Sequence, residues 1–330
     1  MVNGLYSDIL QAPSMSTAKP APPALFVVGS FVVGVTIRVP RWLVPGETLL
    51  GDLFDLGPGG KGTNQAIAAA RQGARVDLLV ALGDDVFGRM ARELYAAESL
   101  SLDHVHTLPG ERTGCGTVTL VGGENQIALY PGANLALTPA HVAAAAPAIA
   151  RARLLLAQLE APLETILAAF RLGRASGTLN VLNPAPARPL PAELFPLIDL
   201  LTPNETEARL LLSLTADDPA PTETLARRLL DLGVSTVVIT RGPRGALIAD
   251  ASGIRTVSAP RITSIDPTGA GDTFNGVLAH ALASGLPLDE AVFRATRAGA
   301  WCATRLGVID GIPTADQLSS FIEQHPLSPL

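Results

Sequence analysis

Short runs of apolar residues alternate with amphipathic segments along the chain from residue 25 onward. Leu25-Phe26-Val27-Val28-Gly29 is the first of these runs, and its length and composition predict a buried strand. Similar runs predict strands at 76–82, 154–159, 179–182, 198–202 and 236–240. Helical spacing of apolar residues predicts helices at about 65–72, 85–98, from 139, from 162, from 205, and at 222–232, 270–284, 287–304 and 314–324. The alternation predicts an α/β fold in which helices cover both faces of a mostly parallel sheet.

In two other stretches, apolar and polar residues alternate on either side of a turn, which predicts exposed β ribbons. One spans residues 35–56 around a turn at Pro45-Gly46-Glu47, and the other spans 114–131 around a turn at 122–125. Neither fits easily into a parallel sheet, so we expect a small β lid. Because no internal repeat or long linker is visible, we expect one domain over residues 24–330. An extension over residues 1–23, rich in Pro, Ala and Ser, is expected to be disordered.

Composition and charge narrow the classes of function. The chain has 330 residues, 48% of them hydrophobic, and a net charge of −6. Because its basic residues form no stripe along the chain, we expect no nucleic-acid binding. No apolar run reaches the roughly 18 residues of a membrane span, so we expect no membrane insertion. The only cysteines, Cys115 and Cys302, fit a reducing compartment, and we expect a cytoplasmic protein.

The stretch from Asp266 to Phe274 combines two glycines with an aspartate at the start of a predicted helix. Free backbone N–H groups and the positive end of the helix dipole favour an anion there. Gly269 and Gly271 allow a ligand to approach the backbone closely. Asp272 alone could be an ordinary helix-start acid. Together with the glycines it suits phosphoryl transfer, which needs an aligned nucleophile more than a strong base.

The segment Gly57-Pro58-Gly59-Gly60-Lys61-Gly62 matches G-x-G-x-x-G, so a dinucleotide site must be considered. That site requires a buried strand directly before the glycines, whereas residues 51–56 are half polar. The segment does not match a phosphate-binding loop of the Walker type either. That motif requires Ser or Thr after the lysine, whereas Gly62 follows Lys61. Lys61 and Asn64 lie one turn apart at a helix start, which favours a site for a polyhydroxylated ligand over a purely structural turn.

Polar residues also follow the predicted strands, at the edge where open sheets bind ligands. Glu160 and Asn183 end two of these strands, and Thr240-Arg241-Gly242 ends another. A predicted helix begins at Asn204-Glu205-Thr206-Glu207. One interpretation is that these residues merely cap the helix. Glu207 could equally hold Mg²⁺ through water, since this ion keeps most of its waters.

Three motifs occur in order along the chain: Gly59-Gly60-Lys61-Gly62-Thr63-Asn64-Gln65-Ala66, Asn204-Glu205-Thr206-Glu207 and Gly269-Ala270-Gly271-Asp272-Thr273-Phe274. With them, residues 25–321 resemble the ribokinase-like (PfkB) family of carbohydrate kinases. Residues 132–134, 158–160 and 182–188 resemble its ribokinase branch more than its fructokinases or adenosine kinases. The resemblance implies a three-layer α/β sandwich with a small β lid. It also implies ATP-dependent phosphorylation of a primary hydroxymethyl group of a sugar, with a pentose favoured.

The resemblance further implies a role for each matching residue. Asp272 would be the base, and the anion hole would be formed by the amides of Gly269, Ala270 and Gly271. The residues that would hold the sugar are Gly60, Lys61, Asn64, Glu160 and Asp272. Those that would line the ATP site are Asn204, Thr240, Gly242 and Gly271. Glu207 would hold Mg²⁺ through water, and the potassium ligands would be Asp266 and the carbonyls of Thr268, Cys302 and Gly307. A homodimer formed through the lid is also implied.

The chain departs from the family at two places. Val32 and Gly34 stand where an Asn and an Asp usually bind sugar hydroxyls, so the identity of the sugar stays open. A modified or deoxygenated sugar or a nucleoside is an alternative substrate, and a non-catalytic sugar- or nucleotide-sensing protein is an alternative function. Gly311 replaces a residue that often supplies a side-chain oxygen to the potassium ion, which predicts a weaker or altered cation site.

Overall fold

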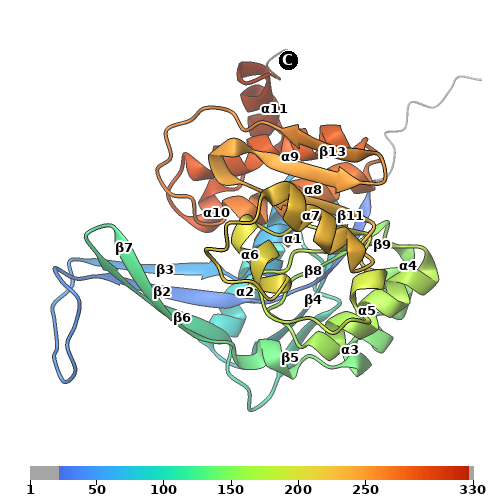
Figure 1. The fold of residues 1–330 in the computed structure, drawn as a ribbon. Helices are drawn as coiled ribbons and strands as arrows, with labels where there is room; N and C mark the ends of the chain where they lie inside the picture. Colours follow the sequence, from blue (N-terminus) through green and yellow to red (C-terminus); the bar gives the residue numbers. More distant parts are fainter. Residues whose placement is uncertain (1–21, 327–330) are drawn as a thin grey trace, which may run out of the picture.

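The computed structural model describes residues 22–326 (Figure 1). The extension expected over residues 1–23 therefore lies, apart from its last two residues, outside the described part of the chain. Among these described residues, none of the helices combines the length and the apolar character needed to span a bilayer.

A nine-stranded sheet forms the centre of the molecule, in the order β13-β12-β11-β10-β9-β8-β1-β4-β5. The strands are β1 (Ala24–Val28), β4 (Arg75–Gly83), β5 (Val105–Leu108), β8 (Leu154–Ala157), β9 (Leu179–Leu182), β10 (Leu200–Leu201), β11 (Thr236–Thr240), β12 (Ala246–Asp250) and β13 (Gly253–Val257). All neighbours pair in parallel except β12, which pairs antiparallel with β11 and β13. The prediction of a mostly parallel sheet is confirmed.

Helices cover both faces of this sheet and make three layers (Figure 1). One face packs against α1 (Lys61–Arg71), α2 (Val86–Ala97), α8 (Ala270–Ala283) and α9 (Leu288–Ala303), with α10 (Val308–Gly311) and α11 (Ala315–Gln324) beyond. The other packs against α3 (Pro139–Ala144), α4 (Ala146–Arg151), α5 (Leu163–Ser176), α6 (Glu205–Leu211) and α7 (Thr222–Asp231). Alternate residues of β1 enter the two cores, Leu25 and Val27 on one side and Phe26 and Val28 on the other. The continuous apolar runs thus mark strands that are buried on both faces.

A second sheet of four strands, in the order β3-β2-β6-β7, extends to one side of the main body (Figure 1). Its strands are β2 (Val32–Arg38), β3 (Leu53–Gly59), β6 (Gly114–Val121) and β7 (Glu124–Tyr130). The turn predicted near 45–47 is present, since the Glu47 N–H donates to the Val44 carbonyl at 3.1 Å. The ribbon is longer than the predicted 35–56, because β2 and β3 pair from Val32↔Gly59 to Arg38↔Leu53. Strand β2 also pairs in parallel with β6 from Val32 onward, which joins the two predicted ribbons into one sheet. Pairing between segments so distant in sequence leaves no local pattern.

Several element boundaries differ from the sequence prediction. The helix predicted from residue 139 divides into α3 and α4, because Pro147 in the first turn of α4 has no N–H to continue the ladder. Helix α1 begins at Lys61, four residues before the apolar spacing becomes visible. Strand β5 and the one-turn helix α10 were not predicted. Short 3₁₀ helices occur at Gly132–Ala136, Phe195–Leu197 and Gly242–Arg244.

Candidate active site

The first turn of α8 lies at the carboxyl-terminal edge of the central sheet. Gly269 precedes the helix with φ +80° and ψ −5°, a left-handed conformation that glycine adopts without strain. The Ala270 N–H donates to the Pro267 carbonyl at 3.1 Å and closes the turn. A side chain at Gly271 would meet no atom within 4 Å, so this backbone borders open space. The helix start therefore has the exposed, positively polarised backbone that an anion requires.

Asp272 projects from this turn and is 9% exposed. Its Oδ2 accepts a hydrogen bond from Asn64 Nδ2 at 2.8 Å, and its Oδ1 accepts one from Gln65 Nε2 at 2.9 Å. Both donors belong to the first turn of α1, which crosses α8 closely. A side chain at Gly276 would come within 2.4 Å of the Gln65 carbonyl oxygen, so this glycine permits the crossing. The carboxylate is thus held by two donors from another helix.

A buried polar network continues from Asp272 into the central sheet. Gln65 Nε2 also donates to Asn183 Oδ1 at 2.9 Å, and Gln65 Oε1 accepts from Gln158 Nε2 at 2.7 Å. Asn183 Nδ2 donates to the Thr202 carbonyl at 3.0 Å. These side chains come from α1 and from the ends of β8, β9 and β10. Sequence reasoning missed Gln65 and Gln158, although two buried glutamines in apolar surroundings are an unusual pattern.

The start of α1 brings the predicted sugar-binding residues together. Glu160 Oε2 accepts from the Lys61 N–H at 2.9 Å and from Ser30 Oγ at 2.5 Å. Gly60 has φ +98°, and a side chain there would lie 2.8 Å from the Ser30 carbonyl oxygen. Burial lowers the pKa of Lys61, but the carboxylates of Asp272, Glu160 and Glu207 outweigh it and leave the pKa above its usual value. Ser30, which links β1 to this cluster, was not predicted.

The predicted nucleotide-binding residues lie on the neighbouring loops. Asn204 and Glu207 form a capping box on α6, with each side chain accepting from the other's backbone N–H at 2.8 Å. An isolated parallel β-bridge also pairs Asn204 with Thr240 at the end of β11. Gly242 lies two residues after Thr240 and has φ +55°. Burial raises the pKa of Glu207, with a further contribution from the Asp272 carboxylate. The structural interpretation of this motif as a cap is thus correct, and it does not exclude a second role.

Comparison with known proteins identifies the family of the chain. The model of the pfkB family carbohydrate kinases matches residues 23–315. The chain belongs to this family. It is a sugar kinase of the ribokinase-like fold, as the sequence motifs predicted.

Individual members of the family are similar to this kinase over nearly their whole length. Ribokinase from Haemophilus influenzae is 38% identical over 300 residues, which cover 91% of this chain and 98% of that protein. Deoxyribokinase from Salmonella typhi is 31% identical over 298 residues, covering 90% and 97%. The structure of Arabidopsis thaliana ribokinase complexed with ribose and ATP superposes with a TM-score of 0.86 at 27% identity, covering 92% and 99%.

The predicted cation ligands of the kinase also lie together. Asp266 Oδ1 accepts from the Thr268 N–H at 2.9 Å, and Asp266 Oδ2 accepts from the Gly307 N–H at 3.4 Å. Cys302 Sγ lies 3.6 Å from the Thr268 carbonyl oxygen. A side chain at Gly311 would point at Cys302, 3.0 Å from its Sγ and 3.4 Å from its carbonyl oxygen. A side-chain oxygen at position 311 would therefore lie in the same small region as the other predicted cation ligands.

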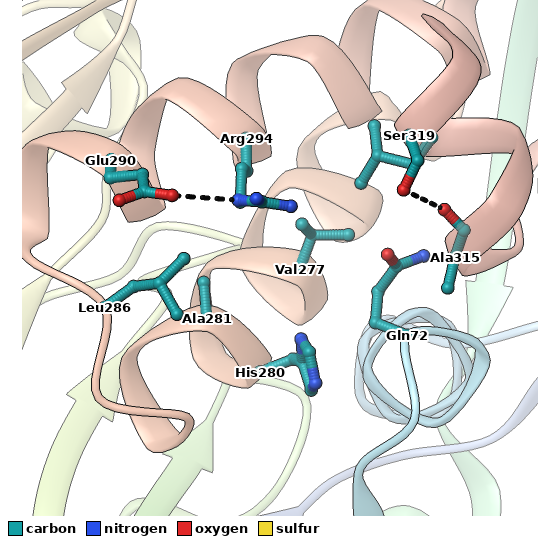
Figure 2. A pocket seen from close by; sticks show the side chains of 10 residues that line it. Gln72, Val277, His280, Ala281, Leu286, Glu290, Arg294, Ala315 and Ser319 are labelled. Carbon is teal, nitrogen blue, oxygen red and sulfur yellow. Dashed lines mark hydrogen bonds and ion pairs between the residues drawn. The ribbon is translucent and has the colours of Figure 1, made fainter. Parts of the chain in front are cut away.

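A cavity of about 270 Å³ lies away from these residues, between α8, α9, α11 and the end of α1 (Figure 2). Val277, Ala281 and Leu286 contribute its apolar surface. Its charged side chains pair with each other, since Arg294 Nε lies 3.4 Å from Glu290 Oε1. None of the residues predicted for the active site lines this cavity.

Proposed function

We propose that the kinase transfers the γ-phosphoryl group of ATP to the primary hydroxymethyl group of a pentose. The observation that carries this proposal is the position of Asp272, whose carboxylate lies beside the open first turn of α8 and against the start of α1. An alcohol bound near Asn64 would be close to the carboxylate, and a phosphoryl group bound at Gly271 would be close to both.

In the proposed reaction, the hydroxymethyl oxygen attacks the γ-phosphorus, the bond to the β-phosphate oxygen breaks and ADP leaves. The hydroxyl proton passes to Asp272. Backbone N–H groups at Gly269 and Gly271 would stabilise the charge on the transferred group, and the Ala270 N–H would share its hydrogen between this group and the Pro267 carbonyl, to which it donates at 3.1 Å. Asn64 Oδ1 supports a sugar nearby, because it is buried and has no hydrogen-bond partner among the residues that the structure describes. A sugar hydroxyl that donates a hydrogen bond to this oxygen would remove the free-energy cost of leaving a buried acceptor unpaired.

The kinase would use two cations. Glu207 would hold Mg²⁺ through water, with Asn204, Thr240 and Gly242 bordering the nucleotide, and the ion would neutralise phosphate charge. A single carboxylate fits this mode of binding, since residues 22–326 contain no group of three His, Cys, Asp or Glu side chains able to hold a metal. Asp266 and the carbonyls of Thr268, Cys302 and Gly307 would hold K⁺, more weakly than usual because Gly311 adds no oxygen.

A screen of ATP consumption over pentoses, hexoses, deoxysugars and nucleosides, with and without potassium, tests the proposal. We expect rapid ADP formation with at least one pentose or pentose derivative. Val32 and Gly34 favour a substituted or deoxygenated pentose. The similarity of the chain to a deoxyribokinase supports this choice. No ADP formation with any of these sugars would refute the proposal and would favour a sensing protein.

We also propose a homodimer that forms through the small sheet, in the cytoplasm. Phe54 and Ile37 are paired across β3 and β2 and are 68% and 43% exposed, and Tyr130 on the same face is 52% exposed. These exposed apolar side chains on one face of the small sheet favour a partner surface there. Sedimentation equilibrium should give twice the chain mass, and Phe54→Asp should give the monomer mass. A wild-type monomer at micromolar concentration would exclude this dimer.

A further inference from the structure

The cavity between α8, α9, α11 and the end of α1 has two kinds of surface (Figure 2). Val277, Ala281 and Leu318 form an apolar wall, and each is at most 2% exposed. Arg294 and Glu290 lie one turn apart on α9 and bring two opposite charges to the same space. The volume of about 270 Å³ is just below the about 300–1,000 Å³ usual for sites of drug-sized ligands. The cavity therefore suits a compact molecule with apolar and charged parts.

The charged side chains of the cavity have hydrogen-bonding capacity that the protein leaves unused. Arg294 Nε lies 3.4 Å from Glu290 Oε1, and neither Nη atom of Arg294 donates to any described residue. The Oε2 atom of Glu290 likewise has no partner within residues 22–326. Figure 2 shows the guanidinium directed into the cavity. The two side chains are 41% and 50% exposed, so a ligand can reach both of them.

The other polar side chains that line the cavity add no charge. Gln72 and Ser319 are neutral, and each donates to a backbone carbonyl, at 2.9 and 2.8 Å. Burial lowers the pKa of His280, and the nearby Arg294 charge lowers it further, so the imidazole is neutral at neutral pH. Arg294 and Glu290 therefore carry the only charges among the described residues that line the cavity.

We propose that this cavity is an effector site for an aliphatic α-amino acid. The carboxylate of the ligand would accept from the Nη atoms of Arg294, and its ammonium would donate to Glu290 Oε2. Its apolar side chain would lie against Val277 and Ala281. A zwitterion fits better than a simple anion or cation, because Arg294 and Glu290 together carry no net charge. Hydrogen bonds between charged groups are about twice as strong as those between neutral ones, which suits recognition by this pair.

The cavity lies at the far ends of the two helices that hold the reacting carboxylate. At a rise of about 1.5 Å per residue, Gln72 lies about 12 Å along α1 from Asn64, and His280 lies about 12 Å along α8 from Asp272. The two helices cross closely at Gly276, where a side chain would come within 2.4 Å of the α1 backbone. A ligand in the cavity would contact α8 and α9 beside the end of α1. Its binding should therefore alter how Asn64 is placed against Asp272.

Titration calorimetry with the full chain compares L-leucine with three molecules that each lack one of its parts. 4-Methylpentanoate lacks the ammonium, 3-methylbutylamine lacks the carboxylate, and glycine lacks the apolar side chain. We expect each to bind at least about tenfold more weakly than leucine, the usual effect of one charged hydrogen bond or one buried aliphatic side chain. No binding of leucine at millimolar concentration, or equal binding of leucine and 4-methylpentanoate, would overturn the proposal. The measurement needs no turnover, so its failure is distinct from a failure of the proposed function.

Variants of the two charged residues test the placement of the ligand. Arg294→Met keeps an aliphatic side chain and should lower the affinity for leucine by at least about tenfold. Glu290→Gln should abolish the preference for leucine over 4-methylpentanoate, because no charge remains to attract the ammonium. Asp289→Asn is the matched control and should bind leucine as the wild type does, since Asp289 pairs with Arg255 at 2.6 Å and does not line the cavity. Unchanged leucine binding in Arg294→Met, or an unchanged preference in Glu290→Gln, would overturn the placement.

The effector role is tested through the affinity for ATP. Saturating leucine should change the Kd for ATP by at least about fivefold, the lower end of the usual coupling between two sites. Because such coupling is reciprocal, saturating ATP should change the Kd for leucine by the same factor. Binding of leucine with no change in the Kd for ATP would overturn the effector role.

Discussion

Replacement of Asp272 by Asn tests the reaction chemistry most directly. The carboxylate accepts from Asn64 and Gln65 with both oxygens, at 2.8 and 2.9 Å. An amide of the same shape keeps one acceptor but turns its NH₂ group toward the other donor. Loss of one hydrogen bond at a buried site should destabilise the fold by about 1–3 kcal/mol. Loss of the base should lower kcat by about 10²–10⁴-fold.

The assay is steady-state ADP release with the best substrate, together with ATP affinity measured by titration calorimetry. ATP should still bind, because Asp272 would act on the alcohol. Asp289→Asn is a matched control, since it removes a carboxylate from the first turn of the neighbouring helix α9, where Asp289 pairs with Arg255 at 2.6 Å. That variant should keep its turnover. If Asp272→Asn turned over within about threefold of the wild type, a role for Asp272 as the base would be untenable.

Four further changes test the other parts of the site. Gln65→Met should lower kcat by about 10- to 100-fold with little change in the KM for ATP, because it releases Asp272 from its position; a change in KM alone would contradict this. Val32→Asn with Gly34→Asp should raise kcat/KM for free ribose by at least about tenfold, through new charge-assisted hydrogen bonds, and no gain would place hydroxyl recognition elsewhere. Gly311→Ser should lower the potassium concentration that gives half-maximal activity; unchanged activation would remove residue 311 from the cation site. The apparent Mg²⁺ affinity should fall as pH falls through the raised pKa of Glu207, because only the ionised carboxylate attracts the hydrated ion, and Glu207→Gln should abolish this dependence; an unaltered pH profile in that variant would exclude Glu207 as the ligand.

The candidate reaction centre could be predicted from the sequence because its signals are local. Two glycines, an aspartate and a helical apolar pattern lie within residues 266–274, and the structure builds α8 from them. The strands of the central sheet were visible for a similar reason, since burial on both faces demands continuous apolar runs.

What the sequence could not show depends on contacts between distant segments. Gln65 meets Asp272, 207 positions further along, only because α1 and α8 cross. Gly34, Gly57 and Gly116 become neighbours only through the pairing of β2 with β3 and β6. No pattern within a short window specifies either arrangement, so the positioning of the carboxylate and the shape of the candidate sugar site emerge only from the fold.

In the proposed site, the reaction and the choice of substrate depend on two different sheets. Asp272 is held through Gln65 by the ends of the central strands, whereas Val32 and Gly34 belong to the small sheet. Groups without shared partners usually contribute independently to a free energy. Changes on the small sheet should therefore alter which alcohol is phosphorylated without changing how Asp272 acts on it. Asn64 is the exception, because its Nδ2 contacts Asp272 while its Oδ1 faces the small sheet. Substitution of Asn64 should accordingly couple to variants on either side.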